Sequence, residues 1–262
     1  MSQEPSFFSP GSVTRKIHSD PAMAVAGIRA LLQQALHPAA MAGVAKYSDF
    51  RNDTWGRLKR TSDYVNVLTF GPIREAEALS SRIRSVHTKL GVDDPELLLW
   101  VHMAMVDSFL DCAIRSGLVL TDSEQDQYLL EMVRFAELVG LDRESVPANV
   151  KEMKDYFLLM MPSLAASDDA KRSALFLTFP PMSPKLRFAT PAAPAWTYLA
   201  TLASASLPVW ARKMYGVPSL PGHEILTDLS LKTVRKSLTL IPKNLFPSSL
   251  QPTYFENLVE QS

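Results

Sequence analysis

The chain has 262 residues, in which 27 Lys and Arg balance 27 Asp and Glu, with five His and one Cys. A chain of this length can bury a large core without disulfides, and one or two domains are expected. Zero net charge argues against a general nucleic-acid binder, which needs an excess of positive charge. The single cysteine excludes an intramolecular disulfide, a cysteine-based zinc or iron–sulfur site and covalent attachment of haem. A tightly bound transition metal would therefore use histidine or carboxylate ligands.

The N-terminal half of the chain begins with polar sequence and continues into apolar helical segments. Residues 1–20 are predicted to be irregular, with residues 1–11 as a flexible arm. Residues 21–46 are rich in Ala and Leu and contain no acidic residue, which favours a helix buried on most sides. Pro38 is expected to kink or break this helix. Neither a secretory signal nor an uninterrupted apolar span is visible, so the expectation is a cytoplasmic protein without a transmembrane segment.

Helical spacing and capping residues predict a series of further helices. They fall at about residues 57–70, 75–90, 95–116, 122–139, 148–161, 168–178, 192–206 and 225–240. Eleven of the 19 prolines lie from Pro180 onward and break this part of the chain into an extended connection and short helices. Strand-like alternation is absent. The predicted fold is all-α: one multi-helix bundle over residues 12–217, with residues 218–262 as a C-terminal helical extension packed on it.

Common catalytic and metal-binding motifs are missing. No acid stands three residues before a histidine, and His-Glu-x-x-His, Gly-rich phosphate loops and Gly-x-Ser-x-Gly do not occur. Cys112 lies in an apolar helix, which is typical of a small core residue. Adjacent-ligand zinc or di-iron chemistry is therefore disfavoured, while ligands far apart in sequence remain possible.

One helix face carries a cationic stripe. Arg57, Arg60, Thr61 and Tyr64 stand at i, i+3, i+4 and i+7, so they share one face. Two guanidinium groups and a hydroxyl can clamp an anion, because arginine presents a planar fork to carboxylates and phosphates. The same spacing is also typical of a solvated basic face. Spacing alone leaves both interpretations open.

Two histidines are predicted to point into the protein. His87 stands four residues after Ile83, and Ile83, Val86 and Leu90 are expected to form the apolar face of their helix. His102 lies among apolar residues of the next predicted helix. Each is either a hydrogen-bonded core residue or a ligand.

The remaining histidines have different surroundings. His37 directly precedes Pro38, where a carbonyl freed by the proline could hold its ring. His18 and His223 lie in segments predicted to be weakly ordered and are expected at the surface.

A series of sequence blocks follows one another in a recognisable order. The blocks are Gly27–Pro38, Gly43-Val44, Ser48–Phe50, Gly56–Thr61, Phe70-Gly71, Arg84–His87, Asp94–His102, Leu207–Arg212 and Tyr215-Gly216. In this order they resemble the catalytic domain shared by rubber oxygenases (latex-clearing proteins) and the fungal mycophenolic-acid-pathway oxygenase, long described only as a bacterial domain of unknown function. The resemblance covers about residues 12–217. It is more specific than any single motif in the chain.

The resemblance implies a globin-like helical fold that holds a non-covalent b-type haem. In the family a histidine downstream of an Arg-x-x-Lys/Arg-Thr motif is the proximal iron ligand, and His87 matches that position. The motif itself lies on the opposite, distal side and matches Arg57, Arg60 and Thr61. His37 and His102 are second candidates for cofactor contact. A haem needs an axial ligand, an apolar slot and partners for its propionates.

Three departures from the family pattern affect the expected chemistry. Rubber oxygenases have a lysine where this chain has Arg60, and a protonated guanidinium has no lone pair with which to ligate iron. They also use a glutamate base on the His-Pro helix, whereas residues 21–46 here contain no acid. Tyr47 stands where many relatives carry histidine. Cleavage of polyisoprene by the rubber-oxygenase mechanism is therefore in doubt.

The leading hypothesis is a haem-b-dependent oxygenase or oxidase that acts on a hydrophobic small molecule, such as an isoprenoid or another alkene, together with dioxygen. His87 would be the proximal ligand, and Arg57, Arg60 and Thr61 would bind a propionate or polarise dioxygen. The alternative is a non-catalytic helical protein that binds an apolar ligand or a protein partner. A purely structural helical protein is the third hypothesis.

Overall fold

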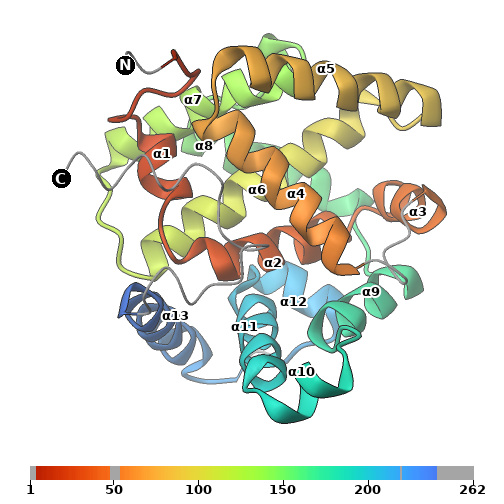
Figure 1. Ribbon diagram of the computed structural model, residues 1–262, viewed down its shortest axis with the longest axis vertical. Coiled ribbons are helices and arrows are strands. Elements are labelled where there is room, and N and C mark those ends of the chain that lie inside the picture. The colour runs from red at the N-terminus through yellow and green to blue at the C-terminus, as the bar shows by residue number, and fades with distance from the viewer. Residues whose placement is uncertain (1–3, 48–53, 219, 241–262) are drawn as a thin grey trace.

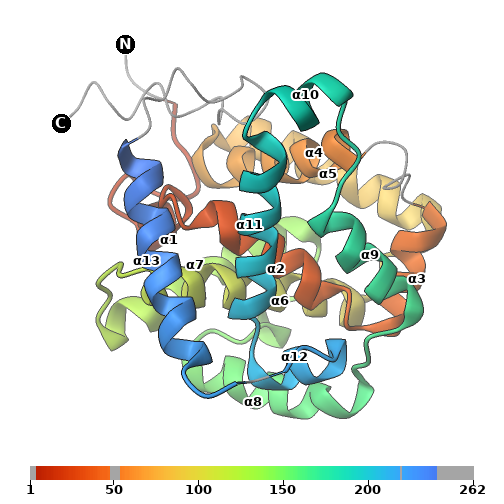
Figure 2. The ribbon, with the colours of Figure 1, turned by 90° about the horizontal axis from the view of Figure 1, so that it is seen from below.

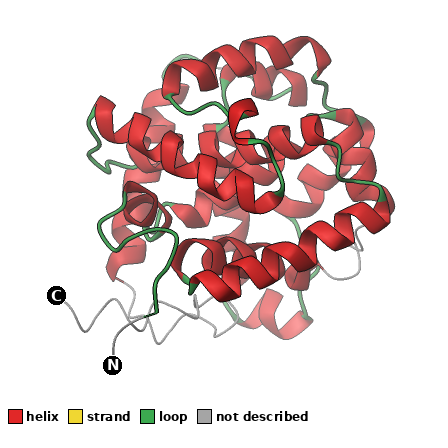
Figure 3. Ribbon diagram, turned by 90° about the horizontal axis from the view of Figure 1, so that it is seen from above, coloured by secondary structure: helices red, strands yellow, loops and turns green. Residues whose placement is uncertain are grey.

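The computed structural model describes residues 4–47, 54–218 and 220–240. Within these ranges every regular element is a helix and there is no strand, which confirms the predicted all-α fold (Figure 3). Parts of three predicted features lie outside the described residues: the start of the N-terminal arm, the Ser48–Phe50 block, and residues 241–262 of the C-terminal extension.

The longer helices agree with the sequence predictions to within a few residues. In chain order they are α1 (Val13–His18), α2 (Met23–Gln34), α3 (Pro38–Tyr47), α4 (Thr54–Phe70), α5 (Ile73–Leu90), α6 (Pro95–Arg115), α7 (Asp122–Val139), α8 (Val150–Met160), α9 (Asp168–Thr178), α10 (Pro184–Ala189), α11 (Ala192–Ser206), α12 (Val209–Tyr215) and α13 (His223–Leu240).

The helix ends follow from local chemistry. Thr121 and Glu124 form the predicted capping box at the start of α7, each side chain accepting a backbone N–H of the other. Gly91 and Gly140 end α5 and α7 in the left-handed region, with φ of 64° and 107°, where a side chain is costly. Pro38 separates α2 from α3, as predicted.

The core is built around α2 and α6, which cross the centre of the molecule side by side (Figures 1 and 2). Trp100 of α6 is fully buried, and its indole N–H donates to the carbonyl of Gln34 at 2.9 Å. Cys112 is also fully buried, and burial raises the pKa of its thiol to about 12. Cys112 is therefore a core residue, as predicted, and not a nucleophile.

Helix α6 is long and apolar enough to cross a membrane by length and composition. Its best 18-residue window has a mean hydropathy of 1.6, and 61% of that window is buried inside the protein. A core helix of a soluble protein has the same properties, so α6 is weak evidence for a membrane span. It is the one such candidate in the described part of the chain.

The N-terminal segment is more ordered than predicted. Residues 13–18 form α1, and the prediction that His18 lies at the surface is wrong, because its ring is 6% exposed. Its two nitrogens lie 2.8 Å from Thr69 Oγ1 and 3.1 Å from Tyr128 Oη. Burial lowers the pKa of His18 to about 3. Phe8 is also buried in the core. The segment is ordered by contacts with distant helices rather than by its own sequence.

The Pro-rich C-terminal part also contains more helix than predicted. The expected extended connection contains α10, and His223 is the first residue of α13. The His223 ring is half-buried, with Nε2 2.9 Å from the Ala205 carbonyl oxygen, so it does not lie in a weakly ordered surface segment. Figure 2 shows α9, α11 and α13 forming one layer of the molecule, with α10 and α12 at its two ends.

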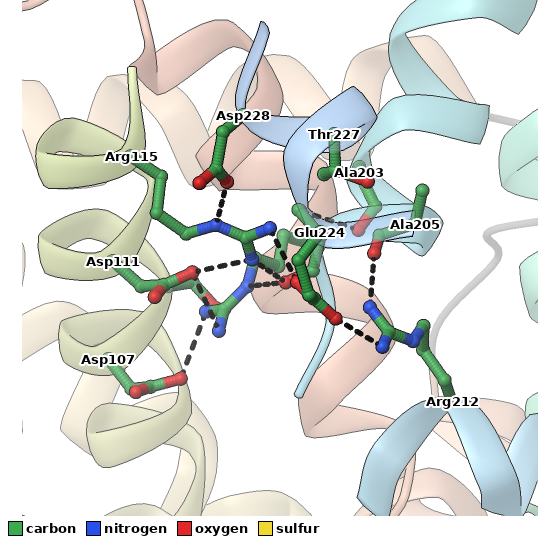
Figure 4. Close-up of polar contacts among 12 residues, drawn as sticks. Asp107, Asp111, Arg115, Ala203, Ala205, Arg212, Glu224, Thr227 and Asp228 are labelled. Carbon is green, nitrogen blue, oxygen red and sulfur yellow. Dashed lines mark hydrogen bonds and ion pairs between the residues drawn. The ribbon is translucent and has the colours of Figure 1, made fainter. Parts of the chain in front are cut away.

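A group of charged residues joins α13 to this body, and we call it the α6–α13 ion cluster (Figure 4). Arg29 of α2 is 1% exposed, with Nη1 2.9 Å from Asp107 and Nη2 3.3 Å from Asp111. Arg115 of α6 lies 2.9 Å from Glu224 and 2.6 Å from Asp228 of α13. The cluster is completed by Arg212, which is also 1% exposed and pairs with Glu224. Sequence reasoning missed this cluster.

Candidate functional site

Helices α4 and α5 form a hairpin around Gly71 and Pro72. The turn requires glycine, since a Cβ at position 71 would lie 2.6 Å from the Val67 carbonyl oxygen. Figure 1 shows the two helices starting together at this turn and then diverging. The first turns of α4 and the last turns of α5 are therefore the most widely separated parts of the hairpin.

Tyr64 of α4 and Ser80 of α5 lie close to each other across the hairpin. Their hydroxyl groups approach across the hairpin, although neither completes a hydrogen bond within the described structure. Arg57 precedes Tyr64 by seven residues and His87 follows Ser80 by seven, which is about two helical turns on each helix. Arg57 and His87 therefore stand at a comparable distance from the turn, on the two arms of the hairpin.

The inward stripe of α5 differs in part from the predicted one. Val86 and Leu90 are 45% and 37% exposed, so the prediction that they share an apolar inner face with Ile83 is wrong. Ser80 is fully buried and Ile83 and His87 are half-buried. These three stand at i, i+3 and i+7, which is one side of a helix. His87 thus lies on the inward stripe, but beside Ser80 and Ile83 rather than between apolar neighbours.

The ring of His87 has an unused nitrogen. Its Nδ1 atom is buried and has no hydrogen-bond partner in the described part of the chain. Burial lowers the pKa of His87, against the opposing charge of Asp93. The imidazole is therefore neutral near pH 7, which is the form that ligates a metal.

The cationic stripe of α4 runs from solvent into the protein. Arg60 and Thr61 are exposed, whereas Arg57 and Tyr64 are half-buried. Burial lowers the pKa of Arg57, and the neighbouring charge of Arg60 lowers it further. Among the described residues Arg57 has no carboxylate partner. The stripe is thus not a fully solvated face.

His102 is buried without any partner. It is 3% exposed, and neither ring nitrogen has a hydrogen bond within the described residues. Its ring lies against Phe135, with centroids 6.0 Å apart, and Tyr64 contacts the same phenyl ring at 6.1 Å. Burial lowers the pKa of His102 to about 4. The prediction that His102 points inward is confirmed. Its neighbourhood is shared with Tyr64 of the α4 stripe.

His37 lies between α2 and α3, apart from this group. Its Nδ1 accepts the backbone N–H of Ala40 at 3.4 Å, so the ring holds the first turn of α3. The ring also faces Trp100, with centroids 6.1 Å apart. Burial lowers the pKa of His37. The expected partner was a carbonyl freed by Pro38, and the partner observed is an N–H group.

Within the described part of the chain, neither a metal-binding cluster nor a cavity marks the predicted site residues. The described residues contain no group of three or more His, Cys, Asp or Glu that could hold a metal ion. A cavity of about 310 Å³ lies between α11 and α13, and none of the predicted site residues lines it. Its walls are Tyr198, Thr201, Leu202, Ala205, Leu220, Pro221, His223, Leu226, Thr227 and Ser230.

Comparison with known proteins decides the family. Residues 15–236 match the family model described as ER-bound oxygenase mpaB/B'/Rubber oxygenase, catalytic domain. The chain belongs to this family. The match runs from α1 into α13 and confirms the resemblance seen in the sequence. No curated protein and no solved structure matches the chain.

The residues of the hairpin fit a haem in their chemistry. A porphyrin supplies four of the iron ligands, so one neutral imidazole from the protein is sufficient. His87 and His102 are both neutral and both have ring nitrogens without partners. Arg57 offers a partly buried cation without a carboxylate partner among the described residues, which suits a propionate. Orphaned polar atoms of this kind call for an additional partner.

Proposed function

We propose that the protein is a haem-b-dependent oxygenase with His87 as the proximal ligand and dioxygen bound on the side of α4. The observation that supports it is the inward placement of His87, whose buried Nδ1 has no partner among the described residues, together with the half-buried cation of Arg57 on the neighbouring helix. Membership of an oxygenase family supports the reaction class. The substrate is proposed to be a hydrophobic small molecule, such as an isoprenoid or another alkene.

The chain's own residues have separate roles in this proposal. When bound, haem supplies the dioxygen and electron-transfer chemistry that side chains lack. His87 ligates in its neutral form, and burial maintains that form. The Arg57 guanidinium binds a propionate, and Arg60 and Thr61 offer N–H and O–H donors toward dioxygen. His102 is the second candidate ligand, and His37 is third because its Nδ1 already accepts a hydrogen bond.

The second candidate function is a non-catalytic protein that binds an apolar ligand or a protein partner. Helix α2 carries no carboxylate, so a reaction that requires an acidic base on that helix lacks the group. Arg60 also cannot ligate iron as a lysine can. Both observations are compatible with a protein that has kept the fold of the family but has no catalytic activity.

Expression with a haem precursor separates these functions. The proposal predicts coloured protein with about one haem per chain by the pyridine haemochrome assay, and a Soret band that shifts on reduction and on carbon monoxide binding. Dioxygen uptake with squalene as the probe then tests catalysis. Protein that is colourless and does not take up added haemin contradicts the proposal. Haem without dioxygen uptake across an alkene panel favours the binding protein.

A further inference from the structure

The charge of the chain is unevenly distributed along its length. Residues 170–223 contain six Lys and Arg and no Asp or Glu. The rest of the chain therefore carries 21 of the 27 basic residues and all 27 acidic ones. This segment begins within α9 and ends at the start of α13. Two of the six are paired with acids just outside the segment, Arg172 with Asp169 and Arg212 with Glu224. The segment keeps an excess of positive charge, which attracts anionic surfaces.

The same segment exposes large apolar side chains. Phe188 is 81% exposed, Leu175 is 63% exposed and Phe179 is 59% exposed. Lys171, Lys185 and Arg187 in the same segment are exposed as well. We call these six residues the α9–α10 surface. Exposed apolar side chains that gather on one surface mark an interaction site, unlike apolar residues that are scattered singly.

Local contacts hold the two parts of this surface together. The Arg187 guanidinium donates to the carbonyl of Pro180 at 3.4 Å, which ties α10 to the residue that follows Phe179. Leu175 and Phe179 stand four residues apart, so they lie on the same side of the chain at the end of α9. Figures 1 and 2 show α10 as a projecting element beside α9 and α11. The exposed Phe188 belongs to this projecting helix.

From these observations we propose that the α9–α10 surface docks on a lipid bilayer that contains anionic lipids. Exposed Phe and Leu with Lys and Arg beside them is the composition of segments that lie in the membrane interface. Positive charge draws the segment to anionic headgroups, and the apolar side chains then enter the acyl boundary. The zero net charge of the chain argues against a nucleic-acid partner, and a bilayer accounts for the local positive charge and the apolar side chains together.

Helix α8 provides a matched contrast within the molecule. Leu158 and Leu159 are 61% and 80% exposed, which is comparable with the α9–α10 surface. Their helix exposes two carboxylates, Glu152 and Asp155, and two lysines, Lys151 and Lys154, so it has no net charge to attract an anionic membrane. In Figure 2, α8 and α10 lie at opposite edges of the molecule. The proposal therefore predicts that α8 does not contribute to docking.

Vesicle co-sedimentation of the full chain tests the proposal. Vesicles of phosphatidylcholine with about one third phosphatidylserine should bind the protein, and pure phosphatidylcholine or 0.5 M salt should weaken binding at least tenfold. Phe188→Ser should weaken vesicle binding by about tenfold. The double variant Lys185→Gln and Arg187→Gln should weaken vesicle binding by about fivefold for each charge removed. The controls Leu159→Ser and Lys154→Gln on α8 should leave it unchanged. All changes are at exposed positions, and thermal melting checks folding.

Several outcomes would overturn the proposal. The first is that the protein binds neither kind of vesicle, and the second is that the α8 control variants lose as much binding as the variants of the α9–α10 surface. The third is binding by charge alone, in which Phe188→Ser has no effect and RNA or polyglutamate competes with the vesicles. A dimer in solution that Phe188→Ser dissolves, without vesicle binding, would instead assign the surface to a second copy of the chain. Sedimentation does not depend on the Soret band, so this test fails or succeeds independently of the proposed haem site.

Discussion

The α4–α5 hairpin and the α6–α13 ion cluster place polar side chains in the protein in opposite ways. In the cluster, Arg29 is fully buried and is paired with two carboxylates and with the Ser206 carbonyl. In the hairpin, the buried atoms Tyr64 Oη, Ser80 Oγ and His87 Nδ1 have no partners among the described residues. Buried polar groups are normally satisfied. Arg29 is therefore satisfied by the described chain, whereas these three hairpin atoms are not.

Two buried histidines repeat the same contrast. His18 uses both ring nitrogens, on Thr69 and Tyr128, while His102 uses neither. Both are buried and neutral, and burial lowers both pKa values. Histidine identity and burial thus do not distinguish a structural residue from a candidate ligand. The distinction lies in whether the chain itself supplies the hydrogen-bond partners.

The largest expected effect is the loss of Arg29. Arg29→Met leaves Asp107 and Asp111 without their shared cation in a partly buried site, which should lower the free energy of unfolding by about 3 kcal/mol. Urea denaturation, monitored by circular dichroism, measures this free energy of unfolding. The control Arg172→Met removes an exposed pair with Asp169 and should cost less than about 1 kcal/mol. Equal effects of the two variants would show that the cluster does not stabilise the fold.

A pH effect of intermediate size is expected from the two buried histidines. In the unfolded chain both bind protons below about pH 6.5, but in the folded protein their pKa values are about 3 and about 4. The unfolded state therefore binds more protons between about pH 4 and 6.5, and stability falls as pH falls. From pH 6 to 5 the two histidines should together remove about 2 kcal/mol. His102→Leu should reduce the loss of stability between pH 6 and 5 by about 1 kcal/mol, and an unchanged loss in that variant would contradict the assignment.

At pH 7, replacing His102 and replacing His18 should change the stability of the protein in opposite directions. His102→Leu removes two unpartnered nitrogens, so the haem-free protein should keep its stability or gain up to about 1 kcal/mol. His18→Leu leaves the Thr69 and Tyr128 hydroxyls unpaired and should cost about 1–3 kcal/mol. Thermal unfolding of the haem-free variants compares them. A loss for His102→Leu as large as for His18→Leu would mean that His102 has a structural partner.

Sequence alone predicts the helices well because their signals are local. The capping box of Thr121 and Glu124, the C-terminal Gly91 and the break at Pro38 each depend on residues within one turn. The burial of Cys112 follows in the same way from the apolar composition of α6. Sequence patterns that span one or two helical turns predict a helix, but they do not predict which other helices pack against it.

The errors concern contacts between residues that are far apart in the chain. His18 is ordered by Tyr128, 110 residues away, and Arg29 is paired with Asp107, 78 residues away. No local pattern contains such partners. Val86 was expected inside because it is apolar, but the hairpin turns its side of α5 outward. Local patterns predicted the candidate site as separate residues, and only the family resemblance placed His87 and Arg57 on opposite sides of one cofactor. Which side chains of α4 and α5 face inward depends on tertiary packing.

The most direct test of the account is ligand rescue at position 87. In His87→Gly the imidazole is removed while the rest of the hairpin is retained, so haem should be bound weakly and without the spectrum of a histidine-ligated iron. Added imidazole should restore that spectrum and the wild-type Soret position. His102→Gly serves as the control and should keep the wild-type spectrum without imidazole. A wild-type spectrum in His87→Gly, or loss and rescue in His102→Gly instead, would contradict His87 as the proximal ligand.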